Sequence, residues 1–138
     1  MSDTSPPSDR MRAGDPAPAA PSPIPVVVPQ TTLDTFFAVD VRVGRITAAA
    51  LNPKARKPAY RLELDFGPLG TRTSSAQLTD LYTPEHLIGR QVAAVVNFPP
   101  RRVAGVNSEV LVLGVADADG AIVLLSLERD APLGSRVH

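Results

Sequence analysis

The sequence predicts a small all-β domain of short strands with a single helical turn, and three observations support this fold class. Apolar and charged residues alternate strictly over residues 61–66 (RLELDF), which is the period of a half-buried strand. Three denser apolar runs, rich in β-branched residues, have the length of core strands: residues 91–98, 110–115 and 122–127. Proline and aromatic residues divide the chain, so that only the part after about residue 31 has the composition of a domain.

The first strand is expected near residues 39–46. Val39, Val41 and Val43 alternate with other residues, but the next large apolar residue is Ile46. The apolar side therefore changes from odd to even positions across Gly44. We expect a β-bulge at Gly44, because an extra residue in one strand produces such a phase change.

One short helix is expected at residues 83–89. Thr83 suits the N-cap, Pro84 the first turn and Gly89 the position after the helix end. Between the last two apolar runs, Asp119-Gly120 predicts a tight hairpin turn, because glycine adopts positive φ at little cost.

These elements have the order of a five-stranded OB-fold barrel. With a weaker strand at residues 71–78, the order is three strands, a helix, two strands and one additional C-terminal strand. In the OB-fold, an exposed face and loops commonly bind oligonucleotides or other extended ligands. We place this domain at residues 32–138. Phe36 and Phe37, at the domain entry, are expected to form a helical turn over the barrel bottom rather than a base-stacking surface.

Residues 1–31 are expected to be a disordered extension. Eight of the 15 prolines lie in residues 1–33, and all six Phe and Tyr follow residue 34. A Pro/Ala/Ser segment cannot bury enough apolar surface to offset its ordering entropy. A linker or extension is the favoured interpretation, and a Pro-rich docking segment is the alternative.

Composition excludes several classes of protein. The formal net charge is 0, which excludes a strongly basic protein that coats nucleic acid by bulk charge. The absence of cysteine excludes disulfide frameworks, Cys-ligated zinc, iron–sulfur clusters and thiol nucleophiles, and fits a cytoplasmic protein. We expect neither a membrane anchor nor a cleaved signal, because no apolar run approaches the roughly 18–20 residues of a membrane span.

Motifs of catalysis are missing from the sequence. Its two histidines, His86 and His138, have no recognisable nucleophile or metal ligand beside them. No Gly-rich phosphate loop, HExxH or GxSxG occurs. We therefore expect a binding protein without catalysis, cofactor or metal.

Charge is segregated along the domain. Residues 41–62 carry six basic residues and no acid: Arg42, Arg45, Lys54, Arg56, Lys57 and Arg61. From Glu109 onward, the sequence has five acidic residues and two arginines. Such a basic stretch is equally typical of a solvated surface and of a local site for an anion.

The segment between the fourth and fifth strands is a second candidate site. In residues 97–109 (NFPPRRVAGVNSE), a stiff Pro-Pro corner is followed by Arg101 and Arg102. Guanidinium groups can contact phosphate bidentately or lie on a base or peptide plane, and a proline-restricted backbone lowers the entropy lost on binding. The alternative is a solvated turn with a structural salt bridge to Glu109.

The motifs NFPPRRVAG, NSEVLVLG and VDVRVGRI, with SSAQ at residues 74–77, resemble the CsaA-like family. These bacterial secretion-related chaperones are built on the tRNA-binding-domain type of OB-fold. The resemblance covers roughly residues 33–138. It implies a small homodimer that binds tRNA and export-bound polypeptides.

Two loop motifs of the wider tRNA-binding-domain group match this sequence only in part. Its His-Pro-x-Ala-x-Lys loop, whose Lys is implicated in tRNA contact, reads Asn52-Pro53-Lys54-Ala55-Arg56-Lys57 here, so Lys57 matches and Asn52 replaces the His. Its Ser-x-Gly-Met motif appears as residues 108–111 (SEVL), which keeps Ser108 and loses the Gly-Met pair. Glu109 adds an acid where phosphate would approach, which weakens attraction unless an arginine neutralises it.

Two functions follow as hypotheses. A non-catalytic protein would bind tRNA through phosphate contacts of a basic face, with steep salt dependence. Alternatively, a dimeric chaperone would bind unfolded or pre-export polypeptides in apolar grooves with basic rims. The candidate residues for tRNA or peptide binding are Arg42, Lys54, Arg56, Lys57, Ser74, Gln77, Asn97, Phe98, Arg101, Arg102 and Ser108.

Overall fold

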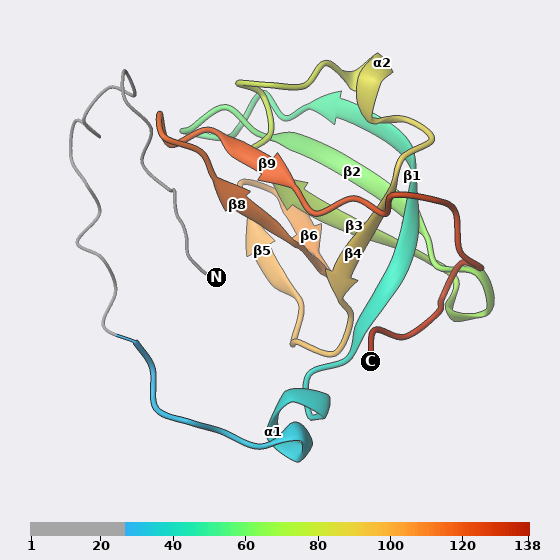
Figure 1. Cartoon of the computed structure of the whole chain (residues 1–138). Coiled ribbons are helices and arrows are strands. Elements are labelled where there is room, and N and C mark those ends of the chain that lie inside the picture. Colours follow the sequence, from blue (N-terminus) through green and yellow to red (C-terminus); the bar gives the residue numbers. More distant parts are fainter. Residues whose placement is uncertain (1–26) are drawn as a thin grey trace. The chain divides into compact units, whose positions relative to one another are not determined.

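A long, curved first strand organises the domain in the computed structural model, which describes residues 27–138 (Figure 1). In chain order the elements are α1 (Leu33–Phe37), β1 (Val41–Leu51), β2 (Tyr60–Asp65), the 3-10 turn η2 (Gly67–Leu69), β3 (Thr71–Ala76), α2 (Pro84–Leu87), β4 (Gln91–Val95), β5 (Arg101–Val103), β6 (Val106–Ser108), β7 (Leu111–Val112), β8 (Gly114–Ala116) and β9 (Ile122–Leu124). The extension expected over residues 1–31 falls almost wholly outside the described residues and stays a prediction.

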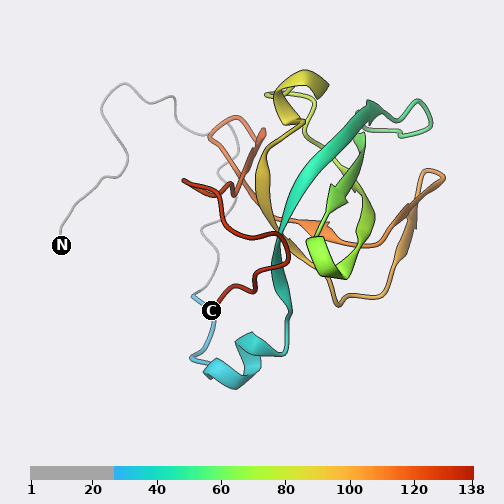
Figure 2. The same ribbon diagram turned by 90° about the vertical axis from the view of Figure 1, so that its right-hand side faces the viewer.

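The main sheet is antiparallel and has the strand order β3-β2-β1-β4-β7. The first half of β1 pairs with β4 and its second half pairs with β2, so the strand bends from one side of the sheet to the other (Figures 1 and 2). Backbone and side-chain hydrogen bonds join the outer edge of β3 to Ser108, the last residue of β6, and to Glu109, which follows it. The result is a nearly closed five-stranded barrel, as the OB-fold prediction required.

Alternation along β2 supplies the core. Leu62, Leu64 and Phe66 are fully buried, as their period of two predicts. They pack with Ile46 of β1 and Leu87 of α2 in one apolar cluster. This cluster is the hydrophobic core of the barrel.

The expected bulge at Gly44 is wrong in position. Pairing between β1 and β4 runs through Gly44 without a shift, and the irregularity lies between Ile46 and Ala48, opposite β2. Gly44 has another role, because a Cβ at this position would lie 2.6 Å from Cε1 of Phe66. The missing side chain thus makes room for the Phe66 ring on the same side as Ile46.

The helix at α2 and the turn after β8 are confirmed. Thr83 caps α2, its hydroxyl accepting from the backbone N–H of His86. Gly120 has a φ of 84°, and the carboxylate of Asp117 accepts from the backbone N–H groups of Asp119 and Ala121. The run 110–115, in contrast, is divided between β7 and β8.

The helical turn at Phe36 and Phe37 forms as α1, but none of its residues is buried. It lies at one end of the domain, before β1 (Figure 2), and contributes no residue to the buried core. No helix within residues 27–138 is both long and apolar enough to cross a membrane.

Candidate nucleic-acid interface

The loop between β1 and β2, residues 52–59, is folded tightly around Asn52. The backbone N–H of Asn52 donates to the carbonyl of Ala59 at 2.9 Å and closes the loop at its base. The side-chain oxygen of Asn52 accepts from the N–H of Lys54 at 3.1 Å. An asparagine that bonds the backbone two residues later makes an Asx turn, which orders the backbone at the start of the basic segment.

A hairpin of β5 and β6 lies against this loop. Its two-residue turn, Ala104-Gly105, has positive φ at both positions, 47° and 85°, as a type I′ turn requires. The side-chain amide of Asn52 donates to the carbonyl of Ala104. A Cβ on Gly105 would lie 3.4 Å from Cδ of Lys54, so the lysine stem runs beside the turn.

The loop and the hairpin enclose a groove of about 850 Å³, which we call the basic groove. Its lining residues are Lys54, Ala55, Arg56, Lys57, Ala59, Ser75, Gln77, Val103 and Ala104. Lys54, Arg56 and Lys57 are exposed, and no ion pair among residues 27–138 includes them. Three exposed cations beside a groove concentrate positive charge locally on a chain without net charge.

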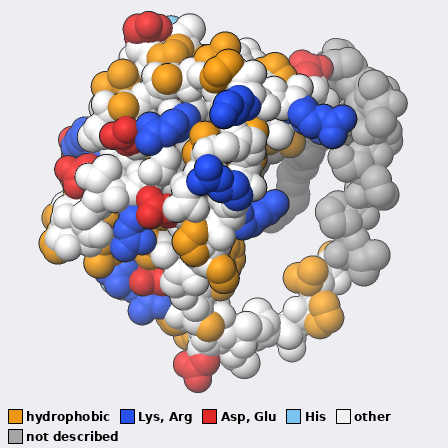
Figure 3. All heavy atoms as spheres, turned by 180° about the vertical axis from the view of Figure 1, so that it is seen from behind, with side chains coloured by type: hydrophobic (Ala, Val, Ile, Leu, Met, Phe, Trp, Pro, Cys, Tyr) orange, Lys and Arg blue, Asp and Glu red, His pale blue; other side chains and the backbone are white. Residues whose placement is uncertain are grey.

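A smaller hollow of about 250 Å³, the hairpin pocket, lies next to the basic groove along β5 and β6. It is lined by Ser75, Phe98, Pro99, Arg101, Val103, Ser108, Glu109, Val110 and Leu111. Ser75 and Val103 line both hollows, which therefore adjoin. On the face shown in Figure 3, several Lys and Arg side chains gather in the upper half, with hydrophobic side chains between them.

Seven of the eleven sequence-predicted residues line these two hollows: Lys54, Arg56, Lys57, Gln77, Phe98, Arg101 and Ser108. Arg102 is exposed on β5 next to Arg101 but lines neither hollow. The expectation that both arginines lie in a loop is wrong, because β5 pairs them with Ser108 and Asn107 of β6.

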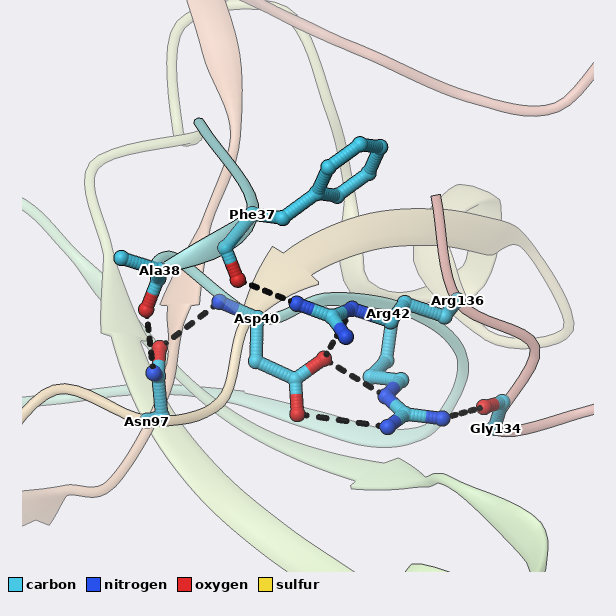
Figure 4. Close-up of polar contacts among 7 residues, drawn as sticks. All are labelled: Phe37, Ala38, Asp40, Arg42, Asn97, Gly134 and Arg136. Atoms are coloured by element: carbon cyan, nitrogen blue, oxygen red, sulfur yellow. Dashed lines mark hydrogen bonds and ion pairs between the residues drawn. The ribbon is translucent and has the colours of Figure 1, made fainter. Parts of the chain in front are cut away.

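Arg42 and Asn97 lie elsewhere, in a network that joins the start and the end of the domain (Figure 4). The Arg42 guanidinium donates to both carboxylate oxygens of Asp40, at 2.7 and 3.3 Å, and to the carbonyl of Gly134 at 3.0 Å. Arg136 pairs with the same carboxylate at 3.3 Å and donates to the carbonyl of Phe37. The Asn97 amide accepts from the N–H of Asp40 and donates to Ala38.

Ser74 is fully buried, and its hydroxyl donates to the carbonyl of Val110 at 2.8 Å. Its neighbour Ser75 lines both hollows instead. Ser75 belongs to the SSAQ motif but is not among the eleven site residues that the sequence predicts. The alternation of β3 could have separated the two serines, because adjacent residues of a strand face opposite sides.

The salt bridge between the arginines and Glu109, which the alternative interpretation requires, is absent among residues 27–138. The Glu109 carboxylate accepts from the backbone N–H of Thr73 at 2.8 Å, and the Glu109 N–H donates to the carbonyl of Thr73 at 2.8 Å. The hydroxyl of Ser108 accepts a further hydrogen bond, from the backbone N–H of Ser75 at 3.1 Å. These contacts fix both side chains at the edge of β3.

Comparison with known proteins shows which family this domain resembles. Residues 41–136 match the family model "Putative tRNA binding domain". The chain is 36% identical over 104 residues to a methionine–tRNA ligase of Porphyromonas gingivalis and 40% identical over 112 residues to methionine–tRNA ligase 1 of Sorangium cellulosum. These matches cover 75% and 81% of this chain but 15% and 16% of the ligases.

Solved structures of similar size align more completely. The chaperone CsaA of Bacillus anthracis superposes with a TM-score of 0.75 at 49% identity, and that of Picrophilus torridus with 0.73 at 41%. The alignments cover 80% and 79% of this chain and all of each CsaA chain. A MetRS-related protein of Pyrococcus horikoshii gives 0.71 at 29% identity. The barrel, the full coverage and the family match together show that the chain belongs to the tRNA-binding-domain family and, within it, to the CsaA-like group.

Proposed function

We propose that this protein binds tRNA in the cytoplasm, without catalysis, through the phosphates that face its basic groove. The observation that carries the proposal is the position of Lys54, Arg56 and Lys57 on one groove of a tRNA-binding-domain barrel. Lysine and arginine bind phosphate oxygens and release counterions from the nucleic acid. Arg101, in the adjoining pocket, adds a fourth cation to the same surface.

Salt dependence tests this proposal quantitatively. Three or four phosphate contacts give a slope of log affinity against log salt of about −2.7 to −3.6, so that affinity for bulk tRNA falls roughly 40- to 150-fold between 50 and 200 mM salt. The full chain is titrated with labelled tRNA at several salt concentrations. Lys57→Ala is expected to weaken binding and reduce the slope by about 1.

Arg129→Ala is the matched control. This variant removes one equally charged side chain from an exposed ion pair with Glu128 that lines neither hollow. Its slope is expected to equal that of the unsubstituted protein. Equal slopes for Lys57→Ala and Arg129→Ala would show that the groove is not the contact surface, and absence of binding at 50 mM salt would reject tRNA as the ligand.

Binding of unfolded polypeptides is a second candidate function. The neighbours from B. anthracis and P. torridus are titled chaperones, and the hairpin pocket exposes Phe98 (45%) and Leu111 (50%). Apolar contacts would dominate such binding, so its salt dependence would be modest. A labelled, reduced and alkylated model protein separates the two functions, because it would bind with little change in affinity between 50 and 200 mM salt.

We also propose that the protein is a homodimer. Val115 (53% exposed) and Leu125 (44%) lie on and beside the short hairpin of β8 and β9, which makes this region apolar at its surface. A second copy would cover these side chains and the nearby strand edge. Light scattering at micromolar concentration is expected to give twice the chain mass of 14.6 kDa, and the mass of one chain would reject the proposal.

A further inference from the structure

Glu109 is an acid within a surface whose other charges are basic. Glu109 lines the hairpin pocket together with Arg101. Thr73 of β3 holds it by two hydrogen bonds of 2.8 Å, one to a carboxylate oxygen and one from the Glu109 backbone. Within residues 27–138 the second carboxylate oxygen has no hydrogen bond or ion pair. The structure therefore holds one acceptor group in a fixed place in this pocket.

An ionised carboxylate accepts hydrogen bonds and donates none, so the group that it binds must be a donor. A phosphate is repelled at this position, in contrast to the basic groove. The other walls are largely apolar, with Phe98, Pro99 and Leu111 among them. The volume of about 250 Å³ lies below the roughly 300–1,000 Å³ of pockets for drug-sized ligands and suits a single flat ring system.

We infer that the hairpin pocket binds one unpaired guanine base of the bound RNA, with Glu109 as acceptor and Phe98 as stacking surface. The inference rests on the proposed RNA-binding function and adds base selectivity to it. Guanine alone presents two adjacent donors, N1–H and N2–H, on its Watson–Crick edge. The free carboxylate oxygen of Glu109 can accept one of them, and the oxygen that accepts from Thr73 can accept the other through its second lone pair. In adenine and cytosine, a ring acceptor beside the amino group faces the carboxylate and is repelled. Unpaired bases are recognised in this way, by stacking and by hydrogen bonds to their edges.

The arrangement of the two hollows supports this division of roles. They adjoin at Ser75 and Val103, so a strand with phosphates in the basic groove reaches the pocket without leaving the surface. Arg101 at the pocket rim can bind a phosphate next to the inserted base. Phosphate contacts would thus supply affinity and Glu109 would supply selectivity.

Fluorescence anisotropy with labelled 12-nucleotide RNAs tests the inference. The set comprises oligouridine and three variants with one central guanosine, adenosine or cytidine. The full chain is expected to bind the guanosine RNA on the order of tenfold more tightly than the other three. Glu109→Gln should abolish this preference and strengthen binding to oligouridine, because it removes a negative charge but keeps an oxygen for the Thr73 N–H. Phe98→Ala should lower the affinity for the guanosine RNA on the order of tenfold, because it removes the stacking surface.

Glu128→Gln is the control, because it makes the same change of charge at an exposed position outside both hollows. It should preserve the guanosine preference. Equal affinity for all four RNAs, or an equal gain for all four with Glu109→Gln, would overturn base recognition while leaving tRNA binding intact. If the protein bound neither tRNA nor any of the four RNAs, the proposed function itself would be overturned. Displacement of every RNA by a lysine-containing peptide that needs Glu109 would assign the pocket to polypeptides.

Discussion

The side-chain amide of Asn52 donates a hydrogen bond to the backbone carbonyl of Ala104 at 3.3 Å, across 52 residues of sequence. The two residues belong to the two walls of the basic groove, the loop after β1 and the turn between β5 and β6. Asn52 is buried, with 8% of its surface exposed, and its side-chain oxygen also orders the loop at Lys54. One amide therefore joins the two walls of the groove and orders the backbone at its first lysine.

Asn52→Ala is expected to lower the free energy of unfolding by about 1–2 kcal/mol, because it removes two part-buried hydrogen bonds, to the carbonyl of Ala104 and from the N–H of Lys54. It should also weaken tRNA binding several-fold at constant salt slope, since the cations remain but are less well positioned. Urea unfolding and tRNA titration measure the two effects. Asn107→Ala, at an exposed position of β6, is the control and should change neither; full tRNA affinity of Asn52→Ala would contradict the positioning role.

Sequence reasoning found the cations of this groove but not the residue that organises it. The strands of the core could be predicted because burial leaves a clear period, as in Leu62, Leu64 and Phe66. Asn52 was noted as a departure from the family loop. Its function depends on a hydrogen bond to a hairpin distant in sequence, and local pattern does not contain that information.

The hairpin of β5 and β6 was missed for a related reason. Its strands have three residues each, which is too short for a periodic signal, and its turn carries Ala104 at a φ of 47° where Asn or Gly is usual. An alanine in the left-handed region costs roughly 1–2 kcal/mol. The residue pair Ala104-Gly105 therefore does not predict a type I′ turn, and the sequence predicts a loop for Arg101 and Arg102.

Ala104→Gly is therefore expected to leave stability unchanged or to raise it by up to about 1 kcal/mol, the relief of the left-handed cost being offset in part by glycine's greater chain entropy. Gly105→Ala should destabilise by about 1–2 kcal/mol, because it puts a Cβ at a φ of 85° and 3.4 Å from the Lys54 stem. Thermal unfolding of the two variants gives the comparison. A stabilised Gly105→Ala would show that the turn does not have this conformation in solution.

Gly44 shows how a correct observation can have a different physical cause. The phase change after Val43 is real, but it reflects a glycine that faces the Phe66 ring rather than an extra residue. Gly44→Ala is expected to cost about 1–3 kcal/mol, because its Cβ would overlap the ring. Phe66→Leu should relieve the overlap, so the double variant should be less destabilised than the sum of the two single variants. Additive losses in urea unfolding would argue against this contact.

Arg42 and Lys57 were both predicted as tRNA contacts, and the structure gives them different surroundings. Arg42 is committed to Asp40 and Gly134, with 26% of its side chain exposed, whereas Lys57 lines the basic groove. Arg42→Ala should therefore lower the free energy of unfolding by about 1–2 kcal/mol, through the loss of charge-assisted hydrogen bonds. It should leave the salt slope of tRNA binding unchanged.

Lys57→Ala should show the converse, with unchanged unfolding and a slope reduced by about 1. Each variant thus serves as the control for the other, since both remove one positive charge from the same strand-and-loop region of the sequence. Urea unfolding and salt titration are measured on the same preparations. A reduced slope for Arg42→Ala would mean that its guanidinium exchanges the Asp40 carboxylate for a phosphate when tRNA binds. In that case the end of the domain drawn in Figure 4 would also belong to the interface.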